Sequence, residues 1–440
     1  MSDYQPERVG IIARMFPGPS SPHPGNRQKD LLMDVPGFAR LLKQHTVDSE
    51  VWWDSSPALY GDYKTKLIQQ YPDMFDAIES LLPDNFIGAL SGISGATTNP
   101  GLISRAIVEQ PRQWQSYIDT LPTGLSCQDK ARDVYDRAIR LGAAQLRPLW
   151  ITSQQRCGWL SAQVENGHAM RAEDIVARGL QLAALAPNVM VKVPGSEQGY
   201  QAMEQLVSWG CSVNNTFCFT VSQFSAGLRA VHNGRLRARI HGIDTDKARY
   251  VISYMIGRLG AESAFADQAR TRRLRLTDDD RRWGELAVYQ AMQAMLRRSQ
   301  TPARLLLCSL KVDTDAQGRE HCWHLQRTGA DTTLYTMTPQ IIEFLIRRQQ
   351  CKRPILPALD WVQVPKRIMN RLMAIPYFTQ AYFDGELPPA SFAGHPAFRT
   401  AGYDASLGQH RLLDFIESAD AGPVAAVAAP RAQAMAGGVR

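Results

Sequence analysis

The sequence lacks the features that send a protein out of the cytoplasm or into a membrane. Its first residues, MSDYQPERVG, contain no charged segment followed by an apolar one, as a secretory leader would. No uninterrupted apolar stretch is long enough to span a bilayer. The seven cysteines are scattered without a Cys-x-x-Cys pair, which argues against a disulfide framework and for a reducing compartment. We therefore expect a cytoplasmic protein with no membrane partner.

The charge pattern gives no sign of a nucleic-acid surface. The sequence has 49 Lys and Arg residues against 42 Asp and Glu residues, a net charge of +7 that is spread along the chain. The densest basic stretch, residues 270–275, is followed at once by Asp278, Asp279 and Asp280, without interleaved aromatic residues. Such mixed-sign runs are typical of solvated helix ends, so we expect no nucleic-acid partner. A mildly basic protein does attract anionic substrates such as sugar phosphates.

The two ends of the chain differ in composition from its middle. Residues 15–26, MFPGPSSPHPGN, are rich in Pro, Gly and Ser and predict a loop within an N-terminal arm over residues 1–47. Residues 419–440 are rich in Ala and Gly and predict a disordered tail. Between these ends we expect one large domain over residues 48–350 and a helical C-terminal extension over residues 351–418.

In the middle of the chain, short β-branched or apolar runs alternate with amphipathic patterns. The runs predict eight strands: Glu50–Asp54, Ile93–Thr97, Gly158–Val164, Asn188–Val193, Ser212–Phe219, Arg249–Ile256, Arg304–Leu310 and Thr332–Thr336. The predicted helices include Pro100–Glu109, Ala172–Leu185, Gly199–Trp209, Ser222–Val231, Asp279–Arg298 and Pro339–Arg348. Such alternation predicts an α/β fold, either a doubly wound parallel sheet or a closed barrel. Eight strand–helix units favour closure into a (β/α)₈ TIM barrel.

One charged residue interrupts an otherwise apolar strand. The segment Asn188–Ser196, NVMVKVPGS, has the composition of a buried parallel strand except for Lys192. Alternation places Lys192 on the same face as Met190, which we expect to be the barrel interior, near the carboxyl end where such barrels hold their active sites. Burial lowers the pKa of an amine, and a neutral amine attacks carbonyl groups. A structural lysine that pairs with a buried carboxylate, or that reaches the rim, explains this strand equally well.

Polar residues also occupy inward positions near the carboxyl ends of five other strands. They are Asp54 in EVWWD, Thr98 and Asn99 in GATTNP, Gln163 in LSAQV, Asn214 and Thr216 in SVNNTFCF, and Ser253 in VISYMIGR. Any one of them alone is better explained as a polar residue close to a loop. Polar ends on five strands that converge on one lysine are the pattern of a barrel active site, and they favour the functional interpretation of Lys192.

Six stretches of the chain resemble the transaldolase family, which includes the fructose-6-phosphate aldolases. In chain order they are WWDSS, SGATTNPGLI, WLSAQVENG, VMVKVPGSEQG, GCSVNNTFCFTVSQ and VISYMIGRLG. ATTNPGLI and VMVKVPGSEQG are specific signals, whereas the other stretches are weak by themselves. The resemblance implies a class I aldolase that works through a Schiff base. Because the imine accepts the electrons of the broken bond, we expect neither a metal nor another cofactor.

The resemblance also implies a role for each candidate residue. Lys192 attacks the ketose carbonyl and carries a dihydroxyacetone unit, while Asp54 takes up and returns a proton at the bond being broken. Thr216 helps to hold the catalytic water, and position 163 works with that water in the family. The substrate-binding residues are Asn99, Asn214, Ser253, Arg258, Ser309 and Lys311, of which Arg258, Ser309 and Lys311 match the family's phosphate site.

The chain departs from the family pattern in three places. Gln163 stands where transaldolases have glutamate, as in the fructose-6-phosphate aldolases, and glutamine orients a water without exchanging a proton with it. Met255 stands where the family has an aromatic residue, and alternation sends the neighbouring Tyr254 to the opposite face. Finally, the segment 232–249 is longer than expected, and the region after Gln350 has no clear counterpart.

These features leave three functional hypotheses. The first is transfer of a dihydroxyacetone unit from a ketose or ketose phosphate to an aldose or aldose phosphate. The second is reversible aldol cleavage that releases dihydroxyacetone, which Gln163 favours. The third is a catalytically silent barrel used for binding or assembly, against which the retention of Lys192 and Asp54 argues. We expect small sugar phosphates as partners and leave a homo-oligomer open. The motif His321-Cys322-x-His324 lacks a full metal-ligand set, so we interpret it as incidental.

Overall fold

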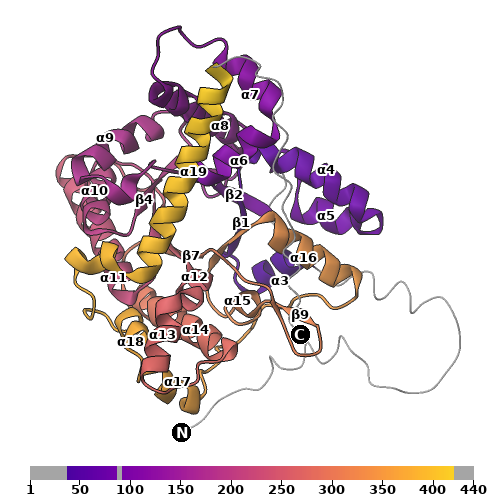
Figure 1. Cartoon of the computed structure of the whole chain (residues 1–440), viewed down its shortest axis with the longest axis vertical. Helices are drawn as coiled ribbons and strands as arrows, with labels where there is room; N and C mark the ends of the chain where they lie inside the picture. The colour runs from indigo at the N-terminus through magenta and orange to yellow at the C-terminus, as the bar shows by residue number, and fades with distance from the viewer. Residues whose placement is uncertain (1–36, 87–91, 421–440) are drawn as a thin grey trace, which may run out of the picture. The chain divides into compact units, whose positions relative to one another are not determined.

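The computed structural model describes residues 37–86 and 92–420, and its main sheet closes into a barrel (Figure 1). Neighbouring strands pair in parallel in the order β1-β10-β7-β6-β5-β4-β3-β2, and β2 returns to β1. The barrel strands are β1 (Glu50–Asp54), β2 (Ile93–Thr97), β3 (Trp159–Gln163), β4 (Val189–Pro194), β5 (Val213–Cys218), β6 (Tyr250–Tyr254), β7 (Ala303–Leu307) and β10 (Leu334–Met337). With helices around this sheet, the predicted (β/α)₈ TIM barrel is confirmed.

Helices of very different lengths connect and follow these strands. The first half of the described chain contains α3 (Phe38–His45), α4 (Tyr60–Gln70), α5 (Phe75–Leu81), α6 (Pro100–Glu109), α7 (Pro111–Ile118), α8 (Cys127–Thr152), α9 (Ala172–Ala183) and α10 (Glu197–Ser208). The second half contains α11 (Val221–Ile240), α12 (Ile256–Ala261), α13 (Ser263–Thr271), α14 (Asp278–Arg298), α15 (Trp323–Gln326), α16 (Pro339–Gln350), α17 (Lys366–Leu372), α18 (Pro376–Tyr382) and α19 (Pro396–Asp420). Short 3-10 helices are η1 (Pro57–Leu59), η2 (Pro72–Met74), η3 (Asp84–Phe86), η4 (Gly167–Ala169) and η5 (Pro389–Gly394). A small antiparallel hairpin joins β8 (Asp313–Thr314) to β9 (Glu320–His321).

The elements follow the sequence patterns closely, with two notable additions. Helix α11 continues to Ile240, so the first half of the segment that looked too long between β5 and β6 is helical. Helix α8, of 26 residues, has no counterpart among the predicted helices, although it buries a face at helical spacing. Local signals explain the better predicted helices: Thr277 and Asp280 form a capping box at the start of α14, and acidic residues fill its first turn. The predicted loop at residues 15–26 lies outside the described residues. So does the predicted tail of residues 419–440, except for residues 419 and 420, which belong to α19.

The barrel interior has two layers, and the upper one carries the candidate site. The lower layer is an apolar cluster of Trp52, Trp159, Met190, Val251, Leu306 and Leu334. Because side chains alternate along a strand, the residue two positions further on also points inward. In all six strands that residue is polar or a cysteine: Asp54, Ser161, Lys192, Ser253, Cys308 and Thr336. An apolar plug therefore lies beneath a ring of polar groups at the carboxyl ends of the strands.

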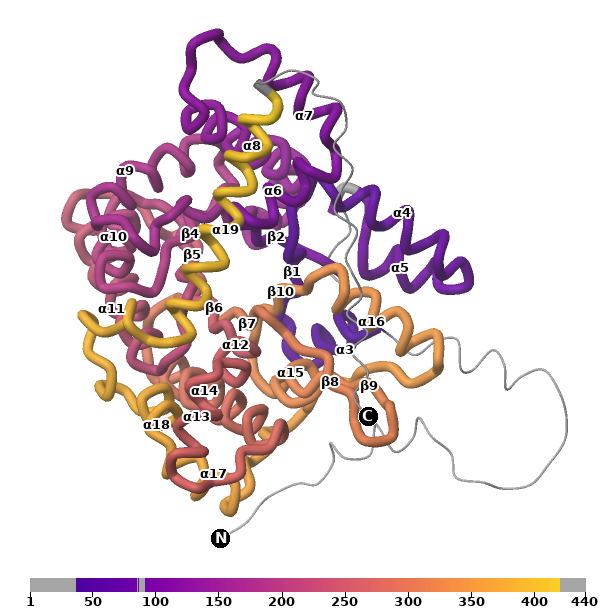
Figure 2. The backbone as a smooth tube through the Cα atoms, viewed as in Figure 1, coloured from indigo at the N-terminus to yellow at the C-terminus, as the bar shows by residue number. Residues whose placement is uncertain are grey.

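The C-terminal part of the described chain forms helices that pack on the barrel. Figures 1 and 2 show α19 crossing the molecule as one long helix, and it contacts α6, α7, α8 and β5. Its apolar residues Ala397, Phe398, Ala401, Leu412 and Ile416 are buried. Helix α18 packs on α13, α14 and α11. Since these helices bury apolar faces against the barrel, they stabilise it as part of the same core.

At the other end of the described chain, helix α3 ends the segment predicted as an N-terminal arm. It buries Phe38, Ala39 and Leu42, and the Phe38 ring meets Tyr335 of β10 edge-on. Within the described ranges, no helix combines the length and the apolar character needed to cross a membrane.

Candidate active site

The side chain of Lys192 lies in the polar ring of the barrel, on β4. It is 8% exposed and makes no hydrogen bond or ion pair with another residue of the described ranges. Burial lowers the pKa of Lys192 below its ordinary value, while the negative charge of Asp54 opposes that shift. A structural lysine would form an ion pair with a buried carboxylate, and Lys192 forms no such pair in the described residues. What the barrel holds is a desolvated amine without a direct partner.

Asp54 at the end of β1 faces the same interior. Its Oδ1 accepts a hydrogen bond of 2.8 Å from the Thr97 hydroxyl, which lies 2.7 Å from the hydroxyl of Thr336. Burial raises the pKa of Asp54, and the charge of Lys192 and the two threonine hydroxyls reduce that increase. The two threonines come from β2 and β10, on either side of β1, so they fix the orientation of the carboxyl group.

A chain of hydrogen bonds orders the side of the ring opposite Asp54. The Ser253 hydroxyl donates to Oδ1 of Asn214 (2.7 Å), and Nδ2 of Asn214 donates to the hydroxyl of Ser161 (2.9 Å). All three side chains are buried. Asn214 is paired in register with Lys192, so this chain fixes the amide beside the amine. Sequence reasoning missed Ser161, although it follows Trp159 at the same two-residue spacing as the other ring residues.

Gln163 and Thr216, the residues that we expect at a catalytic water, flank Lys192 on the neighbouring strands. Gln163 is paired in register with Lys192, and Thr216 with Pro194, two positions further along the same face. Both are buried, and neither side chain has a hydrogen-bond partner among the described residues. Their polar groups thus remain available to a ligand or a water. On β6, Tyr254 turns away from the ring as alternation predicts, and its hydroxyl donates to the carbonyl of Glu285.

The end of β5 leaves the regular strand conformation just beyond Thr216. Phe217 has a φ of 57°, in the left-handed region, and the pairing of β5 with β6 is irregular between Asn215 and Cys218. The Phe217 ring packs edge-on against Phe398 of α19 and against His168 of the loop after β3. Backbone strain at this strand end thus aims an aromatic ring at the C-terminal helix.

Asn99 follows β2 and has a structural task that the sequence did not reveal. Its Oδ1 accepts a hydrogen bond of 3.0 Å from the backbone N–H of Leu102 and so caps helix α6. The Nδ2 group, which carries the amide donors, takes no part in this cap and can donate to a substrate.

Arg258, Ser309 and Lys311 lie at the rim and not in the ring. Arg258 is on α12, directly after β6, and Ser309 and Lys311 follow β7. The Lys311 side chain lies against the first turn of α12, since a Cβ placed on Gly257 would be 2.8 Å from its Cγ. Nη1 of Arg258 is 2.7 Å from Oδ2 of Asp404 on α19. The arginine expected at a phosphate is therefore paired with an acid from the C-terminal extension.

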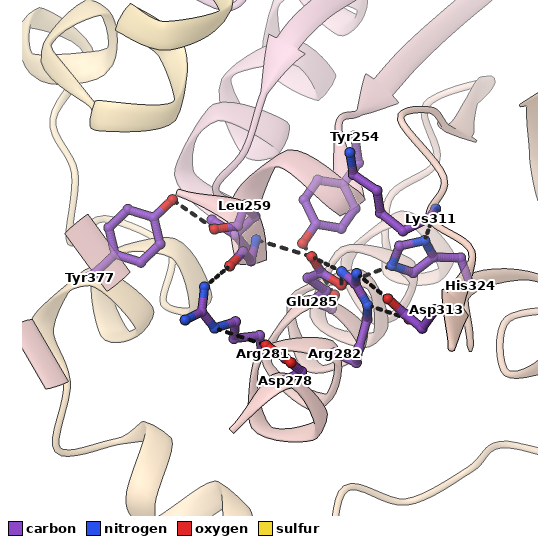
Figure 3. A network of polar contacts seen from close by, with 11 residues as sticks. Tyr254, Leu259, Asp278, Arg281, Arg282, Glu285, Lys311, Asp313, His324 and Tyr377 are labelled. Atoms are coloured by element: carbon purple, nitrogen blue, oxygen red, sulfur yellow. Dashed lines mark hydrogen bonds and ion pairs between the residues drawn. The ribbon is translucent and has the colours of Figure 1, made fainter. Parts of the chain in front are cut away.

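A buried network holds this part of the rim in place (Figure 3). Glu285, which is fully buried, accepts from the backbone N–H of Gly260 on α12 and lies 2.8 Å from Nε2 of His324. Nδ1 of His324 in turn accepts from the backbone N–H of Lys311, so its proton resides on Nε2. Arg282 pairs with Glu285 and with Asp313 of the β8–β9 hairpin. The network links the segment that carries Arg258 to the segment that carries Lys311.

The structure thus separates the predicted residues into two groups. Lys192, Asp54, Gln163, Thr216, Asn214 and Ser253 lie together at the carboxyl ends of the strands, and Asn99, Arg258, Ser309 and Lys311 lie around the rim. Sequence reasoning missed Thr97, Thr336 and Ser161, which orient the ring. It also missed Asp404, because nothing local marks a surface aspartate on a distant helix. His324, interpreted as incidental, is part of the buried network.

In comparisons with known proteins, the chain matches one family. The family model described as Transaldolase/Fructose-6-phosphate aldolase matches residues 75–372. Transaldolase 1 of Streptomyces avermitilis is 30% identical over 172 residues, which are 39% of this chain and 46% of that protein. Transaldolase of Thermobifida fusca is 28% identical over 176 residues, which are 40% of this chain and 48% of that protein. The chain therefore spans about half the length of the curated relatives that it matches.

Proposed function

Because the chain belongs to the transaldolase/fructose-6-phosphate aldolase family, we propose that it transfers a dihydroxyacetone unit from a ketose or its phosphate to an aldose. The unit would be carried as a Schiff base on Lys192. The single observation that carries this proposal is the state of Lys192, a desolvated amine with a lowered pKa and no direct partner, at the carboxyl end of the barrel.

In the proposed reaction, the neutral amine of Lys192 attacks the ketose carbonyl, and loss of water gives a protonated imine. Asp54 removes the proton of the hydroxyl group at the bond to be broken, and the carbon–carbon bond cleaves to release an aldehyde. The imine accepts the electron pair and becomes an enamine. The enamine then attacks the carbonyl of an acceptor aldose while Asp54 returns its proton to the new alkoxide. Hydrolysis of the imine frees the product and Lys192.

The pKa shifts of the pair suit these roles. Burial lowers the pKa of Lys192, so more of the amine is neutral near pH 7, and it raises the pKa of Asp54, which makes that carboxylate a better base. The threonines that bond to Asp54 would aim it at the same substrate atom through both steps.

A second function, reversible aldol cleavage with release of dihydroxyacetone, is favoured by Gln163. This amide lies beside Lys192 without a hydrogen-bond partner in the described chain, so it is free to orient a water toward the imine. Glutamine cannot take the proton of that water. The enamine can then either take up a proton, which leads to release of dihydroxyacetone, or attack an aldose, which completes the transfer. A silent barrel stays the third hypothesis, and the retained pair of Lys192 and Asp54 argues against it.

Borohydride trapping tests the proposal directly. The full chain is incubated with ketoses and sodium borohydride, and the intact mass is measured. We expect a covalent adduct that is lost in Lys192→Ala and kept in Lys247→Ala, which changes an exposed lysine without affecting the barrel interior. No adduct with any ketose in the folded wild-type protein would contradict the proposal. Release of dihydroxyacetone with and without an aldose acceptor then separates transfer from cleavage, and we expect turnover to depend strongly on the acceptor.

Three further expectations belong to this proposal. The substrates are small sugars or sugar phosphates and the reaction needs no cofactor, the protein works in the cytoplasm, and a homo-oligomer is left open, to be tested by light scattering. Each of these remains a prediction.

A further inference from the structure

The rim of the candidate site contains an ion pair that changes the charge a substrate would meet. Arg258 lies 2.7 Å from Asp404, and both side chains are partly exposed, at 32% and 48%. One turn earlier on α19, the Thr400 hydroxyl donates to Glu262 at the end of α12 (2.9 Å). An acid from α19, Asp404, therefore pairs with one of the two bases that would hold a phosphate, and a second acid, Glu262, lies at the end of the helix that carries that base.

We propose that Asp404 selects substrates whose distal end, the end away from the reacting carbonyl, carries a hydroxyl group and not a phosphate. This inference rests on the proposed function, since it names the class of sugar that reaches Lys192. The preferred ketoses and aldoses are unphosphorylated polyhydroxy compounds.

The chemistry of the pair matches a hydroxyl group better than a phosphate. A hydroxyl group donates to one atom and accepts from another, so it can bond to the Asp404 carboxylate and to the remaining N–H groups of Arg258 at once. A phosphate dianion only accepts, and Asp404 has no hydrogen to offer it. Because Arg258 is already paired with Asp404, a phosphate would gain less binding free energy from the guanidinium. It would also be repelled by the negative charge of the neighbouring Asp404 carboxylate.

Asp404 cannot easily withdraw, because the backbone of α19 is anchored on both sides of it. Before Asp404, the Phe398 ring packs on Phe217 with ring centroids 5.4 Å apart. After it, Ser406 lies 3.2 Å from Nε2 of His168. At Gly408 the helix touches α6 so closely that an added Cβ would lie 2.5 Å from Cα of Gly101. The aspartate side chain has a single methylene, so its carboxylate stays near Arg258 even when the ion pair opens.

Arg258 lies at the rim beside the ring that holds Lys192 and Asp54, because α12 follows β6, the strand that carries Ser253 of that ring. Its positive charge opposes the rise in the pKa of Asp54 that burial causes. A sugar bound as a Schiff base on Lys192 would therefore extend toward Arg258 and Asp404, and the pair would contact its distal end.

The test compares D-fructose with D-fructose 6-phosphate in borohydride trapping at concentrations below saturation. The measured quantity is the ratio of the trapping rate for the phosphate ester to that for the free sugar, in the wild type, Asp404→Asn and Asp414→Asn. Comparing variants removes the difference in open-chain content between the two sugars. Asp414 is the matched control, an exposed aspartate on the same helix. We expect the ratio to rise about tenfold in Asp404→Asn, and no more than that because solvent screens a partly exposed charge. In Asp414→Asn it should change less than about twofold.

Calorimetric titration with inorganic phosphate gives a second readout that needs no catalysis. We expect Asp404→Asn to bind phosphate about five- to tenfold more tightly than the wild type, and Arg258→Met in the same background to remove the gain. Thermal unfolding of each variant checks that α19 remains docked.

The outcomes separate the two proposals. Either an unchanged ratio or an unchanged phosphate affinity in Asp404→Asn overturns the role of Asp404. Absence of any adduct in the wild type overturns the proposed function, and the phosphate titration then decides the inference by itself. Tighter phosphate binding by Asp404→Asn supports charge selection at this rim, and unchanged binding overturns it.

Discussion

This molecule has two clusters of buried charged residues whose contacts are opposite in kind. In the network of Figure 3, Glu285 is bonded to Arg282, to His324 and to a backbone N–H. In the polar ring, Lys192 has no hydrogen bond or ion pair within the described residues and interacts only at longer range, mainly with the charge of Asp54. Burying a charge is unfavourable unless it is paired, so full pairing is what structural stability requires. The unpaired amine is unfavourable for folding, and the difference between the clusters distinguishes a site that can react from one that holds the rim together.

The largest effect is expected at the unpaired amine. Lys192→Met should abolish adduct formation completely, because no other residue in the ring can form the imine. It should also leave the protein at least as stable as the wild type, with a gain on the order of 1 kcal/mol, because it removes a buried amine. Intact mass after borohydride and urea unfolding measure the two quantities. A large loss of stability would show that Lys192 is a structural residue; Lys247→Met is the control.

The partner acid should show a smaller effect that depends on pH. Asp54→Asn is expected to lower turnover by roughly 10²–10⁴-fold, because the proton acceptor is lost. In the wild type, the rate of adduct formation should rise with pH as Lys192 loses its proton, with a midpoint below 10.5. Since the charge of Asp54 raises the pKa of Lys192, its removal should move that midpoint to lower pH. Trapping rates between pH 6 and about 10 measure the shift. A midpoint that stays in place would mean that the two groups are not coupled.

The paired cluster should respond in stability. Glu285→Ala removes the acceptor shared by Arg282, His324 and Gly260 and leaves buried donors without partners. We expect a loss of about 3–5 kcal/mol in the free energy of unfolding, measured in urea. Glu417→Ala, at an exposed position of α19, should change it by less than about 0.5 kcal/mol. A loss below about 1 kcal/mol for Glu285→Ala would mean that this network contributes little to the fold.

The smallest effect concerns a buried histidine of the C-terminal extension. His395 stacks on Phe219 and packs against Tyr377, and neither of its ring nitrogens has a hydrogen-bond partner in the described chain. Burial lowers its pKa to about 4 from 6.5. Its contribution to stability is therefore complete above pH 6.5 and falls as the pH decreases toward 4, with a loss of about 2 kcal/mol at pH 5.

His395→Phe should remove this acid sensitivity, because a phenyl ring fills the same space and binds no proton. Thermal unfolding of both proteins at pH 5 and pH 7 measures the effect, with His410→Gln, at an exposed position of α19, as the control. Equal acid sensitivity of the wild type and His395→Phe would exclude His395 as its source.

Much of the barrel was predictable because buried parallel strands are apolar runs bounded by loop residues. The strand that contains Lys192 was found to within one residue at each end, and its inward face followed from alternation. Helix α6 was found with its exact bounds since Pro100 is typical of a first helical position. The hairpin β8–β9, with two residues in each strand, is too short to leave a periodic pattern.

The parts of the candidate site that escaped prediction depend on long-range contacts. Asp404 is an ordinary helical aspartate in the sequence, and only the crossing of α19 over the rim brings it to Arg258. His324 sits in a Cys/His-containing segment, yet its partners Glu285 and Lys311 lie on two other elements. The left-handed backbone at Phe217 is equally hidden, because phenylalanine gives no local signal for that conformation.

The glycine contact between α6 and α19 has a practical consequence for anyone who shortens this chain. At Gly408 the backbone of α19 contacts the backbone of α6 at Gly101. The two helices pack at this point without a side chain between them. An expression fragment that stops after α16 would expose the apolar surface that Phe398, Leu412 and Ile416 cover in the full chain. Such a fragment should aggregate during purification. Fusion tags are therefore better attached beyond residue 420 than in place of the final helix.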